Sequence, residues 1–116
     1  MSTATIYKVC SGEVYDASVV SGRFVGMPVD HADGYLHFST ATQLRDTLRL
    51  YFAGQSGLVL FSVPTAPLGG DLRWEPSRGG DLFPHLFADL PMTAIEAHAL
   101  IDVSADGSVD LPDWVR

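Results

Sequence analysis

Cysteine is nearly absent from this sequence, since Cys10 is the only one among 116 residues. A single thiol cannot form an internal disulfide, and it excludes a metal site built from several cysteines. Cys10 lies in a stretch where apolar residues alternate, so we interpret it as a buried core residue rather than a reactive thiol. The fold must therefore depend on a hydrophobic core, for which 47% hydrophobic residues suffice.

Basic residues are also scarce: seven lysines and arginines stand against fourteen acidic residues, for a formal net charge of −7. The basic residues are scattered and form no stripe that could neutralise a run of phosphates, so nonspecific nucleic-acid binding is not expected. The same negative charge opposes contact with an anionic membrane surface. One or two arginines in a local pocket could still hold a small phosphate-bearing molecule.

Long apolar runs and known catalytic motifs are missing as well. The longest apolar run, residues 57–63, is too short to span a bilayer, and the first residues do not read as a secretion signal. Glycine-rich phosphate loops, the G-x-S-x-G nucleophile elbow and the H-E-x-x-H zinc motif do not occur. We therefore expect a cytoplasmic protein without a metal site, folded as a single domain over residues 1–116, whose oligomeric state the sequence leaves open.

Apolar patterning predicts more strands than helices. Helices are expected at residues 13–20 and between Thr40 and Gly54, where Thr40 and Gln43 have the spacing of a capping box. The continuous apolar run 58–63 predicts a central strand buried on both faces. Further strands are expected at 5–10, 35–38, 71–75 and 93–103, with loops at 23–34 and 76–91 and a hairpin turn at Asp106-Gly107. Two early helices without strict strand–helix alternation favour an α+β fold over a doubly wound parallel sheet.

Polar side chains gather on one predicted strand and on the helix start that follows it. Alternation places Tyr35, His37 and Ser39 on one strand face, next to the N-cap residue Thr40. An imidazole, hydroxyl groups and free backbone N–H groups can together grip an anion or a carbonyl group. A simpler interpretation is also open, in which Thr40 only caps the helix and His37 is a hydrogen-bonded core residue.

A second polar group follows later in the chain. Arg73 and Glu75 share one strand face, and Trp74 occupies the other. The loop after them carries Arg78, two glycines and His85. Arginine offers a planar fork of donors to phosphate, and burial can tune Glu75 or His85 for general acid–base work. Trp74 either stacks on a base or fills the core, and Arg73 with Glu75 either forms a structural ion pair or serves a ligand.

In these residues the chain resembles a family of small bacterial and plant proteins catalogued as domain of unknown function 952. The family pattern is an apolar-Tyr segment, Asp-Gly-aromatic-apolar-His-x-Ser-Thr, Leu-Arg-Trp-Glu, Phe-Pro-His and a closing Leu-Pro. The matching segments follow in the same order over nearly the whole chain: Ile6-Tyr7, Asp33 to Thr40, Leu72 to Glu75, Phe83 to His85, and Leu90-Pro91. That family has no assigned activity, so the resemblance implies a shared fold and not a reaction.

A more distant likeness connects the chain to the ADP-ribosyltransferase fold, in particular to the RNA 2′-phosphotransferases that consume NAD. Those proteins carry Tyr-His-Gly-Thr on a first strand and His-x-His-Leu-Ser before a helix. This likeness implies an α+β fold with a small split mixed sheet and a cleft, with NAD as a candidate cofactor. It also implies that His37 and Ser39 flank the nicotinamide ribose. The chain departs from the pattern at Lys8-Val9-Cys10, where the glycine and threonine that hold the ribose are missing.

The carboxylate that would correspond to a catalytic glutamate is left open by the sequence. Glu75 is one candidate. Glu96 is the other, because it lies two positions from His98 on the last predicted strand, and the two side chains therefore share a face.

Together these observations predict a pocket-bearing domain of the ADP-ribosyltransferase-like fold that binds a nucleotide- or NAD-like, phosphate-bearing molecule. If the domain is an enzyme that transfers an ADP-ribosyl or phosphate group, we expect Glu75 or His85 to be catalytic. The expected ligand-binding residues are Lys8, His37, Ser39, Thr40, Arg73, Trp74 and Arg78. Two alternatives stay open. One is a protein-interaction module that uses the loop 76–90, with exposed Phe83, Leu86 and Phe87. In the other, the polar residues only fasten that loop to the sheet.

Overall fold

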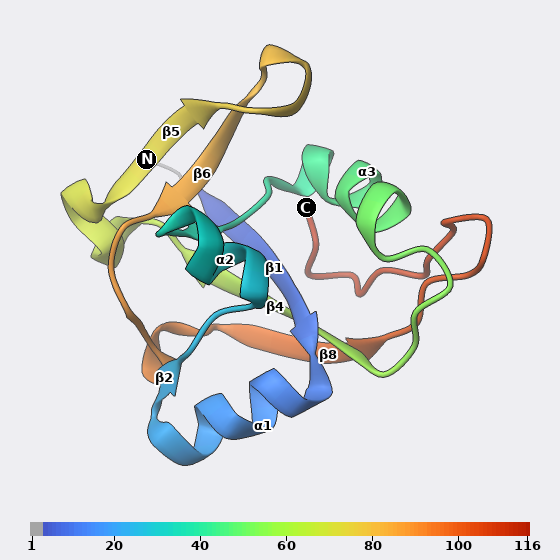
Figure 1. Ribbon diagram of the computed structural model, residues 1–116, viewed down its shortest axis with the longest axis horizontal. Helices are drawn as coiled ribbons and strands as arrows, with labels where there is room; N and C mark the ends of the chain where they lie inside the picture. Colours follow the sequence, from blue (N-terminus) through green and yellow to red (C-terminus); the bar gives the residue numbers. More distant parts are fainter. Residues whose placement is uncertain (1–3) are drawn as a thin grey trace.

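The protein is built around a three-stranded antiparallel sheet in the order β1-β4-β8, in a computed structural model that describes residues 4–116 apart from the side chain of Arg78. The strands are β1 (Thr5–Ser11), β4 (Leu58–Pro64) and β8 (Ala97–Ile101) (Figure 1). All residues of β4 except Pro64 are buried. The prediction of a central strand covered on both faces is therefore confirmed.

A second antiparallel sheet, in the order β3-β6-β5, adjoins the first. Its strands are β3 (Leu36–His37), β6 (Leu82–Leu86) and β5 (Leu72–Pro76), and Figure 1 shows β5 and β6 as a hairpin apart from β8. Two backbone hydrogen bonds between Tyr7 and Ser39, of 2.8 and 2.9 Å, tie the chain after β3 to β1. The two sheets are therefore linked by main-chain contacts at the point where the first polar segment lies.

A third pairing joins β2 (Arg23–Phe24) to β7 (Leu90–Pro91), again antiparallel. Every strand pairing in the described part of the chain has this direction. The α+β class with separate small sheets is thus confirmed, whereas the expected mixed sheet is wrong. The reason is that the connections between paired strands lead back in the opposite direction, and no strand–helix–strand crossover joins parallel neighbours.

In the described residues before β4 there are three α-helices: α1 (Gly12–Ser21), α2 (Pro28–Asp33) and α3 (Ala41–Tyr51). The predicted capping box is present, because the Gln43 N–H donates to Thr40 Oγ1 at 3.2 Å and the Thr40 N–H donates to Gln43 Oε1 at 3.0 Å. The helix is capped at Phe52, so it ends before Gly54. Short 3₁₀ helices follow: η1 (Ala66–Asp71), η2 (Arg78–Gly80) and η3 (Met92–Ala94). None of the helices in the described residues is long and apolar enough to cross a membrane.

Two apolar clusters cover the faces of the central sheet. One contains Leu44 and Leu48 of α3 with side chains of all three strands: Tyr7, Val9, Leu58, Leu60 and Ile101. The other joins the opposite face to the second sheet through Ile6, Cys10, Phe61, Phe24, Phe38 and Leu86. Cys10 is fully buried as expected, and burial raises the pKa of its thiol to about 12.

The two segments expected to be loops contain more regular structure than predicted. Residues 23–34 hold β2 and α2, and the short helix has Pro28 at its start and Gly34 after its end with a φ of 84°. Residues 76–91 hold β6 and β7, where Pro84 lacks an N–H but its carbonyl accepts the Phe38 N–H at 3.0 Å. The last predicted strand shrinks to β8, and no strand follows Asp106-Gly107 in the described residues.

Candidate functional site

A cavity of about 450 Å³ lies where β1, β3, β6, α2 and α3 meet. Its polar lining comes from Lys8 on β1, Asp33 on α2, His37 and Ser39 around β3, Thr47 on α3, and His85 on β6. Apolar side chains share the lining, among them Val9, Leu44, Phe52 and Phe83. The cavity therefore combines two imidazoles and hydroxyl groups with an apolar surface, which is the usual make-up of a small-molecule site.

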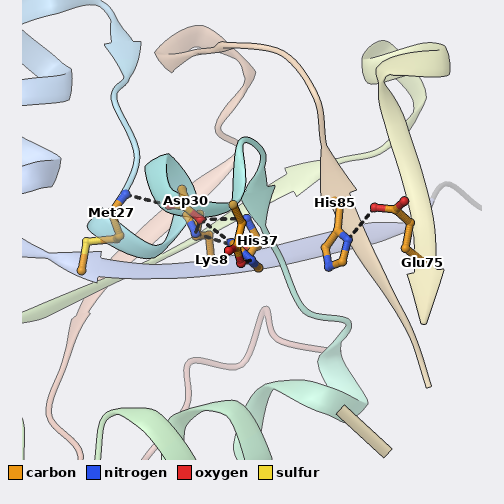
Figure 2. A network of polar contacts seen from close by, with 7 residues as sticks. Lys8, Met27, Asp30, His37, Glu75 and His85 are labelled. Atoms are coloured by element: carbon orange, nitrogen blue, oxygen red, sulfur yellow. Dashed lines mark hydrogen bonds and ion pairs between the residues drawn. The ribbon is translucent and has the colours of Figure 1, made fainter. Parts of the chain in front are cut away.

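His85 is held in the cavity wall by strand register and by a carboxylate. On β6 it lies opposite His37 of β3 and opposite Arg73 of β5. Its Nδ1 lies 2.9 Å from Glu75 Oε1, and only 3% of the residue is exposed (Figure 2). No hydrogen bond from Nε2 is found among the described residues, and the side chain lines the cavity. A neutral ring that donates from Nδ1 to Glu75 presents the lone pair of Nε2.

Asp30 holds the second imidazole in place. Its Oδ1 accepts hydrogen bonds from Lys8 Nζ at 3.0 Å, from the His37 N–H at 2.9 Å and from His37 Nδ1 at 2.8 Å. Its Oδ2 accepts the Met27 N–H at 2.6 Å. Burial alone would raise the pKa of this carboxyl, but the hydrogen bond from His37, the charge of Lys8 and the two backbone N–H groups lower it to about 2. Asp30 is therefore ionised at neutral pH and accepts the hydrogen bond from Nδ1 of His37.

This low pKa predicts a loss of stability in acid. The pKa of Asp30 is below its value of about 3.9 in an unfolded chain, so the folded state favours the ionised carboxylate. The resulting stabilisation is present above about pH 4 and is lost as the pH falls toward about 2, and it amounts to about 2 kcal/mol. A ¹³C NMR titration of the aspartate carboxyl groups measures it directly. A midpoint near 4 for Asp30 would contradict the prediction.

The outer side of His37 faces a second carboxylate. Its Nε2 lies 2.9 Å from Asp33 Oδ2, at the last residue of α2, and 28% of the imidazole is exposed. Tyr35 packs against both imidazoles, with ring centroids 4.6 Å from His37 and 4.2 Å from His85. The two imidazoles are 5.5 Å apart, centroid to centroid. The site thus contains two histidines, each oriented through Nδ1 by a carboxylate.

Lys8 lines the cavity, but its charge is already neutralised. Its Nζ contacts Asp30 and donates to the His37 carbonyl at 2.8 Å, and the residue is buried. The ammonium group of Lys8 has its partners within the protein, and the ligand-binding role of this residue stays a prediction. Lys8 holds both the carbonyl of His37 and the carboxylate that orients its ring.

The hydroxyl residues of the first polar segment divide between two places. Ser39 lines the cavity, and its Oγ lies 3.0 Å from Thr47 Oγ1. Thr40 does not line it, since its hydroxyl and N–H are both used in the capping box of α3. The capping role of Thr40 is therefore confirmed, while its ligand role stays a prediction.

The second polar segment is only partly brought to the cavity. Glu75 contacts His85 without lining the cavity. Arg73 lies with its guanidinium carbon 4.6 Å from the ring centroid of Phe87, away from the lining. Trp74 is 42% exposed on the other strand face, so it neither fills the core nor reaches the cavity. The side chain of Arg78 lies outside the described part of the molecule, although its neighbour Ser77 lines the cavity.

The remaining candidates lie elsewhere. Glu96 and His98 are absent from the cavity lining, and the exposed ring of His98 stacks on Tyr15 at 5.2 Å. The aromatic surface expected for an interaction module is wrong, because Phe83 and Leu86 are buried and Phe87 is half-buried. No group of three or more potential metal ligands is found among the described residues.

Sequence reasoning missed Asp30, the residue that orients His37. Asp30 lies in a segment that patterning predicts as a loop, and its partner Lys8 is distant in the chain. Patterning places Tyr35 on the strand face of His37, but nothing local indicates that its ring contacts both histidines. The available signal for Asp30 was the Pro28 and Gly34 pair that bounds α2.

Comparisons with known proteins give a family and a fold. Residues 9–98 match the model of a family described as protein of unknown function, DUF952. The chain is similar to the X-ray structure of protein CC0527 from Caulobacter crescentus, with 44% sequence identity, 91% of this chain and 93% of that chain covered, and a TM-score of 0.86. The solution NMR structure of CC0527 gives 46% identity, 90% coverage of each chain and a TM-score of 0.79. No curated protein matches the chain.

Proposed function

This chain belongs to the DUF952 family, whose description assigns no activity, and we propose its function from the cavity. The protein binds a small organic ligand in the cavity and exchanges a proton with that ligand through His85. The observation that carries the proposal is the state of His85. Its Nδ1 is fixed by Glu75, its side chain is buried, and its Nε2 is unpaired among the described residues at the cavity wall.

A histidine in this arrangement has the features of a general acid–base group. A carboxylate on one nitrogen fixes the tautomer and the ring orientation, so the other nitrogen is ready to accept or deliver a proton. Glu75, with its side chain 40% exposed, is then the orienting partner rather than the group that touches the ligand. His85 is accordingly the catalytic candidate, and Glu75 is a positioning residue.

The ligand class that we propose is a phosphate-bearing molecule of mononucleotide size. The cavity falls within the range of about 300–1,000 Å³ that is typical of small-molecule pockets. Its apolar lining, including Leu44, Phe52 and Phe83, can cover a planar base, and the imidazoles of His37 and His85 can donate to an oxyanion when protonated. The distant likeness to the ADP-ribosyltransferase fold supports the same ligand class and stays a hypothesis.

NAD itself does not fit the residues present. The relatives of that fold hold the NAD ribose at the place where this chain has Lys8-Val9-Cys10. Here Lys8 is paired with Asp30, and Cys10 is fully buried in an apolar cluster. Neither side chain is available to a ribose, so we propose a ligand smaller than a dinucleotide and no ADP-ribosyl transfer.

The test is a thermal-shift measurement with adenosine monophosphate and adenosine as a pair. At about one hundred times its dissociation constant a ligand stabilises the folded protein by about 2.7 kcal/mol, which corresponds to a shift of several degrees in a domain of this size. We expect this shift with the monophosphate on the wild type, and we expect it to disappear in His85→Gln. The matched control is His98→Gln, which changes an exposed histidine outside the cavity and should keep the full shift.

Two results would contradict the proposal. One is the absence of any shift with either compound on the wild type. The other is an equal shift in His85→Gln and His98→Gln, which would place the binding site away from His85.

A further inference from the structure

The polar side of the cavity already contains an anion that belongs to the protein. We infer that the Nε2 atoms of His37 and His85 form an anion-binding pair for a phosphate monoester, and that Asp33 occupies the place of the ligand's anion on His37 when no ligand is bound. This inference rests on the proposed function. It adds the protein atoms that bind the ligand's anion, the chemical class of that anion, and Asp33 as the residue that competes with the anion.

The direction of the two imidazoles carries the first step. Asp30 binds Nδ1 of His37, and Glu75 binds Nδ1 of His85, so in both rings only Nε2 remains for a ligand. The two rings come from directly paired residues on neighbouring strands, and both line the cavity. With their centroids 5.5 Å apart, one oxyanion can accept a hydrogen bond from each ring when both imidazoles are protonated.

The state of the two Nε2 atoms carries the second step. In His85 this atom is buried at the cavity wall and has no partner among the described residues, which is costly unless a ligand or water supplies one. In His37 the equivalent atom contacts the Asp33 carboxylate at 2.9 Å. Nε2 of His37 thus has a carboxylate of the protein as its partner, whereas Nε2 of His85 has none among the described residues and can donate to a ligand anion when the ring is protonated.

The exposure of Asp33 makes this contact replaceable. Its side chain is 47% exposed and lies at the end of α2, whereas the side chain of Asp30, on the other nitrogen of the same ring, is 2% exposed. Exposed ion pairs contribute only about 0–1 kcal/mol. A ligand phosphate can therefore take the place of Asp33 at low cost, while Asp30 keeps the ring oriented.

The charges of the site show why Asp33 controls which ligand binds. Among the side chains that the structure describes, the carboxylates of Asp30, Asp33 and Glu75 lie next to the imidazoles, and Lys8 supplies a positive charge beside them. A phosphate that entered with Asp33 still in place would be repelled by its charge. Release of Asp33 toward solvent removes that repulsion and frees Nε2 of His37. A neutral ligand gains nothing from this release.

The experiment compares Asp33→Asn with Asp89→Asn by isothermal titration calorimetry, using adenosine monophosphate and adenosine as the two probes. Asp89 is a matched control, because it is an exposed aspartate paired with Arg23 and does not line this cavity. We expect Asp33→Asn to bind the monophosphate at least about fivefold more tightly than the wild type does, and to bind adenosine with unchanged affinity. Asp89→Asn should change either affinity by less than about twofold.

A ¹⁵N NMR measurement on the wild type gives an independent readout that needs no variant. Adding the monophosphate should shift the Nε2 signals of both His37 and His85, whereas the Nδ1 signals, held by Asp30 and Glu75, should move little.

The outcomes separate this inference from the proposed function. Binding that requires His85 but is equal in Asp33→Asn and Asp89→Asn overturns the inference and leaves the proposed function standing. Weaker monophosphate binding in Asp33→Asn also overturns it, since Asp33 would then help to hold the ligand. If the wild type and Asp33→Asn both fail to bind either probe, both proposals are overturned.

Discussion

Replacing Asp30 with asparagine is expected to lower the free energy of unfolding by about 3 to 5 kcal/mol. The carboxylate accepts four hydrogen bonds, and both it and its partner Lys8 are almost completely buried. In Asp30→Asn the ammonium group of Lys8 stays buried without a countercharge, which is more costly than the loss of the hydrogen bonds alone. Urea denaturation followed by circular dichroism measures the change.

The matched control is Asp33→Asn, which removes the carboxylate from the opposite nitrogen of the same imidazole. Because Asp33 is half exposed, this variant should lose no more than about 1 kcal/mol. Equal losses in the two variants would show that Asp30 stabilises the fold no more than a surface aspartate does.

The elements that sequence patterning predicted are those whose signals are local. β4 is a run of apolar residues between Gly57 and Pro64, and its burial on both faces follows from that composition. The start of α3 follows from Thr40 and Gln43, whose side chains satisfy backbone groups three residues away. In both cases the partners that decide the structure lie within a few residues or depend only on apolar character.

The missed elements depend on partners that are far away in the chain. α2 has only six residues, too few to be stable alone, and it is held by contacts from Asp30 to Lys8 and His37. β6 contains Pro84, which disfavours a strand in any local analysis, yet it pairs with strands on both sides. These segments are ordered by tertiary contacts, which a local pattern does not contain.

The candidate site shows the same division. Alternation along each strand correctly grouped Tyr35 with His37 and Arg73 with Glu75, because the side-chain period of a strand is fixed. The register that sets His85 opposite His37 and beside Glu75 is a property of three strands together. Patterning therefore named His37, Glu75 and His85 as candidates, but it could not separate them from Arg73 and Trp74, which lie outside the cavity.

The second large effect is expected at the other half of the buried pair. Lys8→Met removes the ammonium group from Asp30 and from the His37 carbonyl, and we expect it to lower the free energy of unfolding by about 3 kcal/mol. The loss should be smaller than that of Asp30→Asn, because the carboxylate keeps its three hydrogen bonds from Met27 and His37. The methionine side chain also remains well packed beside Phe24 and Phe38.

The double variant Lys8→Met/Asp30→Asn decides whether charge is the cause. It leaves no buried charge without a partner, so it should be more stable than Asp30→Asn alone, and the two losses should fall short of additivity by about 2 kcal/mol or more. Strictly additive losses would mean that Lys8 and Asp30 stabilise the fold independently, through packing. Non-additivity would instead show that Lys8 and Asp30 stabilise the fold as a charge pair, each being required because the other is buried beside it.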